Sequence, residues 1–196
     1  MNLAPVVLFV YNRPWHTQQT LEALQKNYLA NKSILYIYAD GAKENATQED
    51  IKKIQEVRTI IKSQKWCKEV DVIERKNNYS LDTNVFEGIT EIINQYGKII
   101  VLEDDLVTSP YFLKFINEGL AMYENISNIF AINGYMFPIK TDEHKSFLSP
   151  LAVSSWGWGT WAEKWKIIEK NMPDKLLIQQ NEYLKKRFNF GDYEYT

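Results

Sequence analysis

Cysteine is nearly absent from this chain: Cys67 is the only one among 196 residues. A single cysteine cannot form a disulfide within the chain, which excludes the small disulfide-stapled class of domain and fits a reducing compartment. No apolar run approaches the roughly 18 residues of a membrane-spanning helix. The N-terminus also lacks the charged segment and apolar core of a signal peptide. We therefore expect a soluble, cytoplasmic protein, and contact with the inner face of the plasma membrane stays open.

An excess of positive charge is missing as well. The 23 Lys and Arg residues are outnumbered by 25 Asp and Glu, and the formal net charge is −2. Nucleic-acid-binding surfaces need clustered basic residues, so the composition argues against a nucleic-acid partner. A chain of 196 residues is long enough for one domain with a proper core. We expect a single domain over residues 1–196 that is a fragment of a longer protein, because no convincing final element follows residue 188.

Several common catalytic signatures are also absent. No Gly-x-Gly-x-x-Gly follows the first expected strand, where residues 11–14 are Tyr-Asn-Arg-Pro, so a dinucleotide fold of the usual kind is disfavoured. The chain contains neither the Gly-x-x-x-x-Gly-Lys-Ser/Thr phosphate loop nor the Gly-x-Ser-x-Gly motif of serine hydrolases. His16 and His144 have no second histidine or cysteine at metal-ligand spacing.

The sequence does contain a regular alternation of strand and helix patterns. Continuous apolar runs predict buried parallel strands, and apolar residues spaced by three and four predict amphipathic helices. Strands are expected at residues 4–11, 34–39, 70–73, 99–102 and 129–133, and helices at 14–29, 47–61, 81–96, 110–123, 161–170 and 176–188. This order predicts an α/β fold with a mostly parallel sheet and helices on both of its faces.

Boundary signals locate the ends of several expected helices. Thr47, with Asp50 three residues later, forms a capping-box pattern. Gly97 is expected to end the helix that precedes it. Ser109 and Pro110 have the residue types of an N-cap and a first helical position. We therefore predict that the fourth long helix begins at Pro110.

The strongest functional signal is an acidic cluster at the end of an apolar strand. Residues 98–105 are Lys-Ile-Ile-Val-Leu-Glu-Asp-Asp. Adjacent carboxylates repel one another and are seldom all paired with neighbours. A divalent cation such as Mn²⁺ or Mg²⁺, which takes oxygen ligands, would relieve the repulsion among Glu103, Asp104 and Asp105. Acids are also common near the start of a helix, so a solvated acidic turn is the alternative.

Polar residues follow four consecutive expected strands. Asn12 and Arg13 follow the first, Asp40 the second, residues 75–80 the third and residues 103–105 the fourth. The carboxyl ends of parallel strands meet at one edge of an open sheet, where ligands bind. Asp40 could accept hydrogen bonds from a nucleobase or ribose, and Arg13 could face the anionic part of the ligand. An Asp-Gly pair by itself is also a common turn.

Five segments resemble the GT-A glycosyltransferases, in particular the branch with the N-acetylglucosaminyltransferase I family and bacterial surface-polysaccharide sugar transferases. Three of them are residues 6–14 (Val-Val-Leu-Phe-Val-Tyr-Asn-Arg-Pro), 38–41 (Tyr-Ala-Asp-Gly) and 101–106 (Val-Leu-Glu-Asp-Asp-Leu). Residues 109–113 and the Gly-Trp-Gly of residues 157–159 are similar to the same branch. The resemblance implies a GT-A fold, with Glu-Asp-Asp where that family has its Asp-x-Asp-type metal motif.

The resemblance also implies an activity. It implies an inverting transferase of hexosyl type that moves a sugar from a nucleotide-diphosphate donor, commonly a UDP-sugar, to a glycan or lipid-linked glycan acceptor. The usual metal is Mn²⁺. By position, Asp40 would contact the uridine and Asp105 would be the direct metal ligand. Asp104 would lie near the donor ribose or sugar, and Glu103 would hold the sugar.

Inversion in one displacement needs a base that takes the proton of the acceptor hydroxyl. The resemblance implies that this carboxylate lies after the Gly-Trp segment. Our choice is Asp192, ahead of Glu194, with Asp174 third.

The tryptophans within residues 156–161 allow two interpretations. Trp156 and Trp158, with Trp161, could offer faces for stacking on sugar rings of the acceptor or donor. They could equally form a packed aromatic turn below the sheet edge.

Two other functions stay open. A sugar nucleotidyltransferase shares the sheet and the need to bind a metal–diphosphate, but it would want a Gly-rich loop with Lys or Arg directly after the first strand. Residues 12–15, Asn-Arg-Pro-Trp, do not supply that loop. A non-catalytic glycan-binding module would use the tryptophans and would bind sugar whether or not metal and nucleotide are present.

Overall fold

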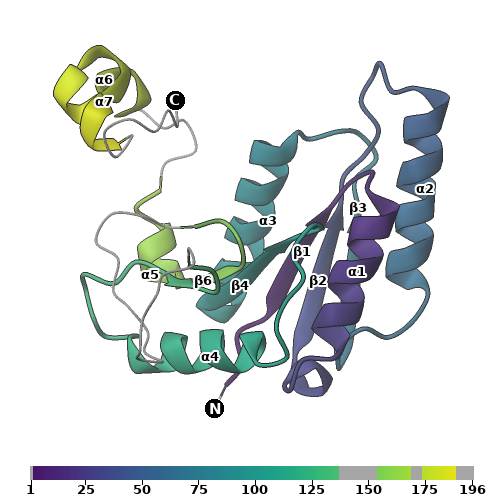
Figure 1. Cartoon of the computed structure of the whole chain (residues 1–196), viewed down its shortest axis with the longest axis horizontal. Helices are drawn as coiled ribbons and strands as arrows, with labels where there is room; N and C mark the ends of the chain where they lie inside the picture. The colour runs from purple at the N-terminus through teal and green to yellow at the C-terminus, as the bar shows by residue number, and fades with distance from the viewer. Residues whose placement is uncertain (1, 137–153, 169–173, 189–196) are drawn as a thin grey trace.

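The computed structural model describes residues 2–136, 154–168 and 174–188, and its centre is one six-stranded sheet (Figure 1). The strands are β1 (Val6–Val10), β2 (Ile34–Ala39), β3 (Glu69–Glu74), β4 (Lys98–Glu103), β5 (Ile132–Asn133) and β6 (Trp158–Trp161). Their order across the sheet is β3-β2-β1-β4-β6-β5. β1 to β4 run parallel, whereas β6 is antiparallel to β4 and β5 is antiparallel to β6.

Helices cover both faces of this sheet. The helices of the described residues are α1 (Pro14–Gln25), α2 (Gln48–Lys62), α3 (Leu81–Tyr96), α4 (Phe112–Met122), α5 (Ala162–Trp165), α6 (Asp174–Gln180) and α7 (Glu182–Phe188), with a 3-10 turn, η1 (Ala30–Lys32), after α1. α6 and α7 lie to one side of the sheet (Figure 1). α1, α2 and α4 pack on one face, and α3 and α5 pack on the other. The α/β fold class with a mostly parallel sheet and helices on both faces is confirmed. Within the described ranges, no helix is both long and apolar enough to cross a membrane.

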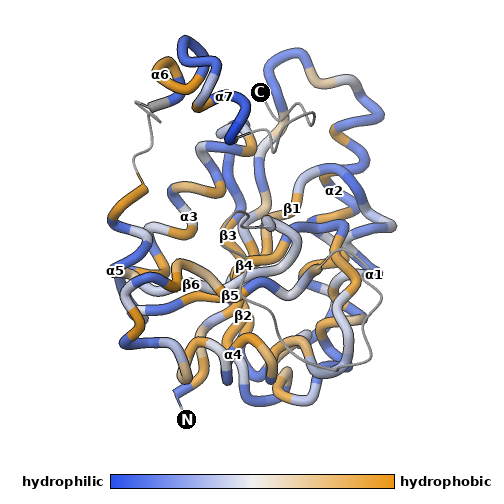
Figure 2. Tube along the Cα trace, turned by 60° about the vertical axis from the view of Figure 1, so that its left-hand side comes forward, coloured by the Kyte–Doolittle hydropathy of each residue, from blue (hydrophilic) through white to orange (hydrophobic). Residues whose placement is uncertain are grey.

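β1 is apolar throughout because it is buried from both sides. Val6 and Leu8 belong to the core under α1, α2 and α4, while Val7 and Phe9 belong to the core under α3. Successive side chains of a strand point to opposite faces of its sheet, so a central strand between two helical layers has no solvent-facing positions. Figure 2 shows this arrangement as hydrophobic strands at the centre and hydrophilic turns on the outer helices.

The predicted boundary signals of α2 and α3 are confirmed. Asp50 N donates to Thr47 Oγ1 at 3.1 Å, and Thr47 N donates to Asp50 Oδ2 at 3.1 Å, which together form a capping box. Gly97 ends α3 with a φ of 76°, and its N–H donates to Ile93 O at 2.8 Å. Glycine adopts this left-handed conformation without the steric cost that a side chain would bring.

The predicted start of α4 is wrong. The helix begins at Phe112, and Pro110 lies in the turn before it. Ser109 gives no side-chain cap; its backbone oxygen accepts a hydrogen bond from Phe112 N at 3.1 Å. The capping oxygen comes from elsewhere in the chain, because Leu113 N donates to Asn27 Oδ1 at 3.0 Å. Because Asn27 lies just after α1 and far from α4 along the chain, this cap leaves no local sequence pattern at the start of α4.

The predicted helix from residue 161 to about residue 170 is shorter in the structure and begins one residue later, and residues 169 and 170 lie outside the described residues. Residues 158–161 form strand β6 against β4, and α5 covers only Ala162–Trp165. Trp161 Nε1 donates to Leu120 O at 3.1 Å, and Thr160 Oγ1 donates to Phe130 O at 2.7 Å. Gly159 is needed for close packing, because a Cβ there would lie 2.7 Å from Ile116 Cγ2. These partners from α4 and the segment after it hold the Gly-Trp segment as a strand.

Candidate functional site

The polar residues that follow β1, β2, β3 and β4 meet at one edge of the sheet, as predicted. Phe9 of β1 is paired with Tyr38 of β2 and with Glu103 of β4, so these strands end close to the same level. From β1 the chain proceeds through β2 to β3, and then returns to add β4 on the other side of β1. The strand order therefore reverses between β1 and β4, which is the point where open α/β sheets bind ligands.

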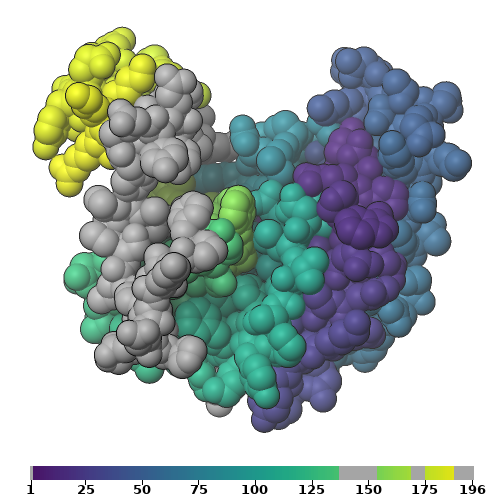
Figure 3. All heavy atoms as spheres, viewed as in Figure 1, coloured from purple at the N-terminus to yellow at the C-terminus, as the bar shows by residue number. Residues whose placement is uncertain are grey.

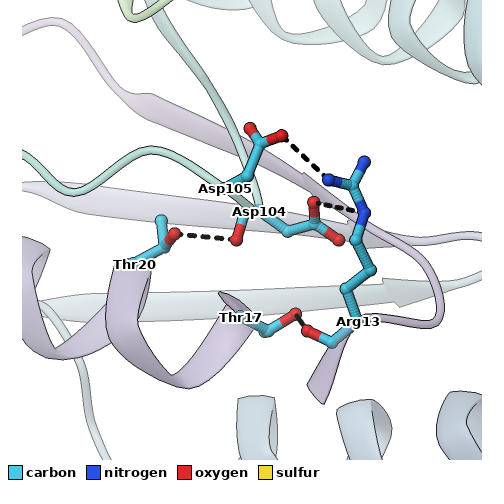
Figure 4. Close-up of polar contacts among 5 residues, drawn as sticks. All are labelled: Arg13, Thr17, Thr20, Asp104 and Asp105. Carbon is cyan, nitrogen blue, oxygen red and sulfur yellow. Dashed lines mark hydrogen bonds and ion pairs between the residues drawn. The ribbon is translucent and has the colours of Figure 1, made fainter. Parts of the chain in front are cut away.

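An ion-pair cluster lies at this switch point (Figure 4). Arg13 Nη1 is 2.8 Å from Asp105 Oδ2, and Arg13 Nε is 3.4 Å from Asp104 Oδ1. Arg13 O accepts a hydrogen bond from Thr17 Oγ1 at 2.9 Å, and Asp104 O accepts one from Thr20 Oγ1 at 2.9 Å. Both threonines are fully buried on α1. Helix α1 therefore holds the backbone of both Arg13 and Asp104 in place. In Figure 3, α1 and the residues that follow β4 lie side by side.

The charges of this cluster are not fully balanced. Burial raises the pKa of Asp104, although the neighbouring Arg13 opposes the rise. Burial also raises the pKa of Glu103, and repulsion by Asp105 and Asp104 adds to it. Burial lowers the pKa of Arg13, but the acids around it more than compensate and leave that pKa raised. One guanidinium thus offsets only part of the negative charge of three carboxylates.

The donor set at this edge fits only one kind of metal site. In the part of the chain that the structure describes, no three His, Cys, Asp or Glu side chains come together as a metal-binding group. Mg²⁺ at nucleotide sites is commonly held by one or two carboxylates together with substrate phosphates and water. Asp105, whose side chain is 43% exposed, can supply such a carboxylate. The residues therefore fit a cation that binds together with a diphosphate, and they do not fit a metal centre made of protein ligands alone.

Asp40 is buried and anchors the loop that follows β3. Its Oδ1 accepts hydrogen bonds from Gly41 N and Tyr79 N, each at 2.9 Å. Its Oδ2 accepts one from Asn78 Nδ2 at 2.9 Å. Both carboxylate oxygens are thus engaged within the chain, in addition to any contact with the nucleotide that the sequence predicts.

Asn12 has a hydrogen-bond partner at the start of α2. Its Nδ2 donates to Asp50 Oδ1 at 3.3 Å, which links the turn after β1 to the first turn of α2. This bond positions Asn12 at the sheet edge, and its predicted contact with the nucleotide stays a prediction.

Arg75 and Tyr79 also belong to this edge, although no sequence motif marks either residue. Arg75 Cζ lies 5.2 Å from the ring centroid of Tyr38 and 4.6 Å from that of Tyr79. The three residues come from two strand ends, so only the strand register brings them together. The sequence signal was limited to the position of residues 75–80 after the third strand.

The two predicted stacking tryptophans have different surroundings. Trp158 is paired with Val101 of β4 and packs on Trp165 with ring centroids 6.2 Å apart, so it extends the core under α3. Trp156 lies two residues earlier, towards the end of β4 where the acids are. It is 52% exposed and meets Tyr135 edge-to-face at a centroid distance of 4.6 Å. Trp156 therefore keeps a face available for a sugar ring, whereas Trp158 is largely a packing residue.

The three candidates for the general base lie near the end of the sequence. Asp192 and Glu194 lie outside the described residues. Asp174 is the first residue of α6, which Figure 1 draws next to α7 and to one side of the sheet.

No protein-family model matches the chain, and no curated protein matches it. Solved structures do match it. The glycosyltransferase GlyE of Streptococcus pneumoniae TIGR4 is 13% identical with a TM-score of 0.44, over 96% of this chain and 43% of GlyE. TarS of S. aureus is 13% identical with a TM-score of 0.40, over 63% of this chain and 20% of TarS. A UDP-glucose pyrophosphorylase in complex with UDP-glucose is 12% identical with a TM-score of 0.37, over 62% of this chain and 55% of the enzyme.

This chain therefore matches less than two thirds of the length of each of the three proteins. At such identities and TM-scores these matches assign neither a family nor a substrate, and the function proposed below rests on the residues of this chain.

Proposed function

We propose that this chain is the nucleotide-sugar-binding catalytic part of an inverting, metal-dependent GT-A glycosyltransferase. The observation that supports it best is the cluster of Arg13, Asp104 and Asp105 at the switch point between β1 and β4. A diphosphate with its cation needs both an anionic ligand for the metal and a cationic group for the phosphate oxygens. Asp105 and Arg13 offer these two groups within 2.8 Å of each other.

The chemistry of such a transfer assigns a role to each group. Asp105 would hold Mn²⁺ or Mg²⁺, which when bound stabilises the negative charge that develops on the diphosphate as the glycosidic bond breaks. Arg13 is 48% exposed, so its guanidinium can turn from Asp105 towards a phosphate oxygen. Glu103 would accept hydrogen bonds from the donor sugar, and the buried Asp104 would lie near the ribose or sugar.

The acceptor would bind on the other side of the acids, beyond β4. Trp156 is exposed there, and its indole offers an apolar face to a sugar ring. In a single displacement the acceptor hydroxyl oxygen attacks the anomeric carbon, the bond to the diphosphate breaks, and a base takes the hydroxyl proton. Asp192 is our candidate for that base.

We infer the biological setting from the sequence resemblance. It favours a UDP-sugar as donor and a glycan or lipid-linked glycan as acceptor, in the synthesis of a bacterial surface polysaccharide. Such a reaction would take place in the cytoplasm or at the inner face of the plasma membrane.

A panel of nucleotides tests the proposal. Thermal unfolding would be followed with UDP, ADP, GDP, CDP and UTP, each with Mn²⁺ and with a chelator. A ligand at 100 times its dissociation constant stabilises the folded state by about 2.7 kcal/mol, so a weak binder is still detected. We expect stabilisation by a nucleoside diphosphate, above all UDP, that is largely lost without Mn²⁺.

Other outcomes of the same panel identify the alternatives. A clear preference for UTP over UDP would favour a sugar nucleotidyltransferase. Stabilisation by oligosaccharides that is indifferent to Mn²⁺ and nucleotide would favour a glycan-binding module. No stabilisation by any nucleotide would overturn the proposal.

A further inference from the structure

The loop after β3 holds Tyr79 by a dense set of contacts. Tyr79 N donates to Asp40 Oδ1 at 2.9 Å, and Asn78 Nδ2 donates to both Asp40 Oδ2 and Gly41 O at 2.9 Å. Gly41 packs directly on this loop, because a Cβ at residue 41 would lie 2.4 Å from Asn77 C. The ends of β2 and β3 are thereby locked together, and the backbone of Tyr79 is fixed at the sheet edge.

The ring of Tyr79 is the outer layer of a stack that starts in the core. Tyr38 is fully buried, and its hydroxyl donates to Glu91 Oε2 at 2.8 Å. Arg75 lies against both rings, with Cζ 5.2 Å from the Tyr38 centroid and 4.6 Å from the Tyr79 centroid. Arg75 Nε also donates to Asn84 Oδ1 at 3.4 Å, so the guanidinium is held from the side. Tyr79 itself is 38% exposed, although Arg75 packs against its ring.

The backbone next to Tyr79 adopts a conformation that is rare for a residue with a side chain. Ser80 has a φ of 65° and a ψ of 159°, a region occupied almost only by glycine. Ser80 N donates to Asn78 Oδ1 at 3.2 Å, which helps to hold this conformation. The chain therefore accepts local strain at the residue after Tyr79, while the hydrogen bonds to Asp40 and Asn78 hold the loop in place.

We propose that Tyr79, supported by Arg75, is the platform on which the nucleobase of the donor stacks, and that Asp40 positions this platform. The inference rests on the proposed function and adds the base-binding half of the same site. It gives Asp40 a positioning role in addition to the direct uridine contact that the resemblance implies, because both of its oxygens hold the loop.

The distance between Asp40 and Asp105 along the sheet edge suits a nucleotide with a diphosphate. Asp40 follows β2 and Asp105 follows β4, with β1 between them. Neighbouring strands lie about 4.8 Å apart, so two spacings give roughly 10 Å. A nucleotide whose diphosphate lies near Asp105 can therefore place its base over the loops that carry Asp40 and Tyr79. Stacking on an aromatic ring accepts any base, so Tyr79 would supply affinity more than base selectivity.

Two substitutions of one residue test this platform. Tyr79→Phe keeps the ring, and Tyr79→Leu keeps apolar bulk but removes the aromatic face. The probe is UDP, with Mn²⁺ for the affinity from titration calorimetry and with Mg²⁺ for the uracil H5 and H6 signals from NMR, because paramagnetic Mn²⁺ would broaden these signals. A stacked base is shifted upfield by the ring current of the tyrosine. Pyrophosphate with Mn²⁺, which has no base, serves as the control ligand.

We expect wild type and Tyr79→Phe to bind UDP alike and to shift both uracil signals upfield. Tyr79→Leu should lose the shift and bind UDP about 5- to 150-fold more weakly, the range for one lost stacking contact. Its affinity for pyrophosphate should be unchanged. Equal UDP affinity of Tyr79→Leu and wild type, or unshifted uracil signals in a wild type that binds UDP, would overturn this inference and leave the proposed function standing. A wild type that binds neither UDP nor any other nucleotide would overturn both.

Discussion

Arg13 contacts both carboxylates that follow β4, so the charge balance of the site depends on this residue. Without a ligand, the guanidinium competes with a divalent cation for Asp105; with a diphosphate bound, it can pair with phosphate oxygens. We predict that Arg13→Gln binds Mn²⁺ alone more tightly and binds UDP with Mn²⁺ more weakly. An exposed ion pair contributes about 0.2–1 kcal/mol, so Mn²⁺ affinity should rise roughly 1.4- to 5-fold.

Titration calorimetry measures both affinities of Arg13→Gln. Lys53→Gln is the matched control, because Lys53 pairs with Glu49 on α2 and its loss removes the same charge away from the acids. An Arg13→Gln variant whose affinity for Mn²⁺ alone is unchanged or lower would show that the guanidinium does not compete with the metal.

Asp105 is the predicted metal ligand, and its side chain is exposed, so replacing it should affect metal binding and not the fold. We predict that Asp105→Ala abolishes the Mn²⁺-dependent part of UDP binding while the protein stays folded, because the change removes a repelling charge together with the ligand. Calorimetry with and without Mn²⁺ measures the binding, and thermal unfolding checks the fold. Glu118→Ala, at an exposed acid of α4, is the control. Unchanged metal-dependent affinity in Asp105→Ala would exclude Asp105 as the ligand.

Asp40 contributes to stability and to binding through the same hydrogen bonds. Asp40→Asn keeps the size of the side chain, but its NH₂ group would face Asn78 Nδ2, which is also a donor. We predict that the variant loses about 1–3 kcal/mol in free energy of unfolding and weakens UDP binding by a similar amount. Urea unfolding and calorimetry measure the two effects, with the exposed Asp71→Asn of β3 as control. If both quantities match those of wild type, Asp40 is an ordinary turn residue.

Helix α4 shows how one element depends on a distant residue for its start. Asn27 Oδ1 accepts the hydrogen bond of Leu113 N, and Asn27 Nδ2 donates to Ala23 O at 3.1 Å and to Thr108 Oγ1 at 3.0 Å. The side chain is buried and so is its bond to Leu113 N, so its removal leaves this N–H buried without a partner. We predict that Asn27→Ala costs more in free energy of unfolding than the roughly 0.5–2 kcal/mol of an ordinary N-cap.

The ordinary N-cap for comparison is in the same chain. Thr47 caps the exposed start of α2 within a local capping box, so Thr47→Ala should fall in the usual range. Urea unfolding of the two variants gives the difference. A smaller loss for Asn27→Ala than for Thr47→Ala would contradict the importance of the buried cap.

The elements that could be predicted from the sequence are those with local causes. The capping box of Thr47 and the left-handed Gly97 lie within a few residues of the helix ends that they set. Strand β6 and the start of α4 could not be predicted, because each needs a partner far along the chain. Gly159 matters through its contact with Ile116, and Asn27 through its bond to Leu113.

In the candidate site too, features with local causes could be predicted and features that need distant partners could not. The strand-end positions of Arg13, Asp40 and Asp105 were predictable, since parallel strands bring their carboxyl ends to one edge. The stack of Arg75 between two tyrosines was not, because it combines side chains of β2 with the loop after β3.

At the scale of the whole molecule, the sheet divides into two halves on either side of the switch point. β3, β2 and β1 carry the loops assigned to the nucleobase and the phosphates, and β4 carries the acids assigned to the metal and the donor sugar. The exposed Trp156, assigned to the acceptor, lies beyond β4 and directly before β6. Under the proposed function, donor binding therefore depends on the segments after β1 to β4, and acceptor binding depends on a different part of the chain. A change on the acceptor side should alter transfer and leave donor binding as it is.

The proposed base gives the sharpest test of that separation. Asp192→Asn, in a form of the protein that transfers sugar, should leave UDP and Mn²⁺ binding unchanged and lower the transfer rate by about 10²-fold or more, because the acceptor hydroxyl loses its proton acceptor. Hydrolysis of the donor by water should fall less, since water needs no fixed acceptor geometry. Glu194→Gln is the matched control. A wild-type transfer rate in Asp192→Asn would move the role to Glu194 or another carboxylate, and a loss of UDP binding would mean that residues 191–195 contact the nucleotide.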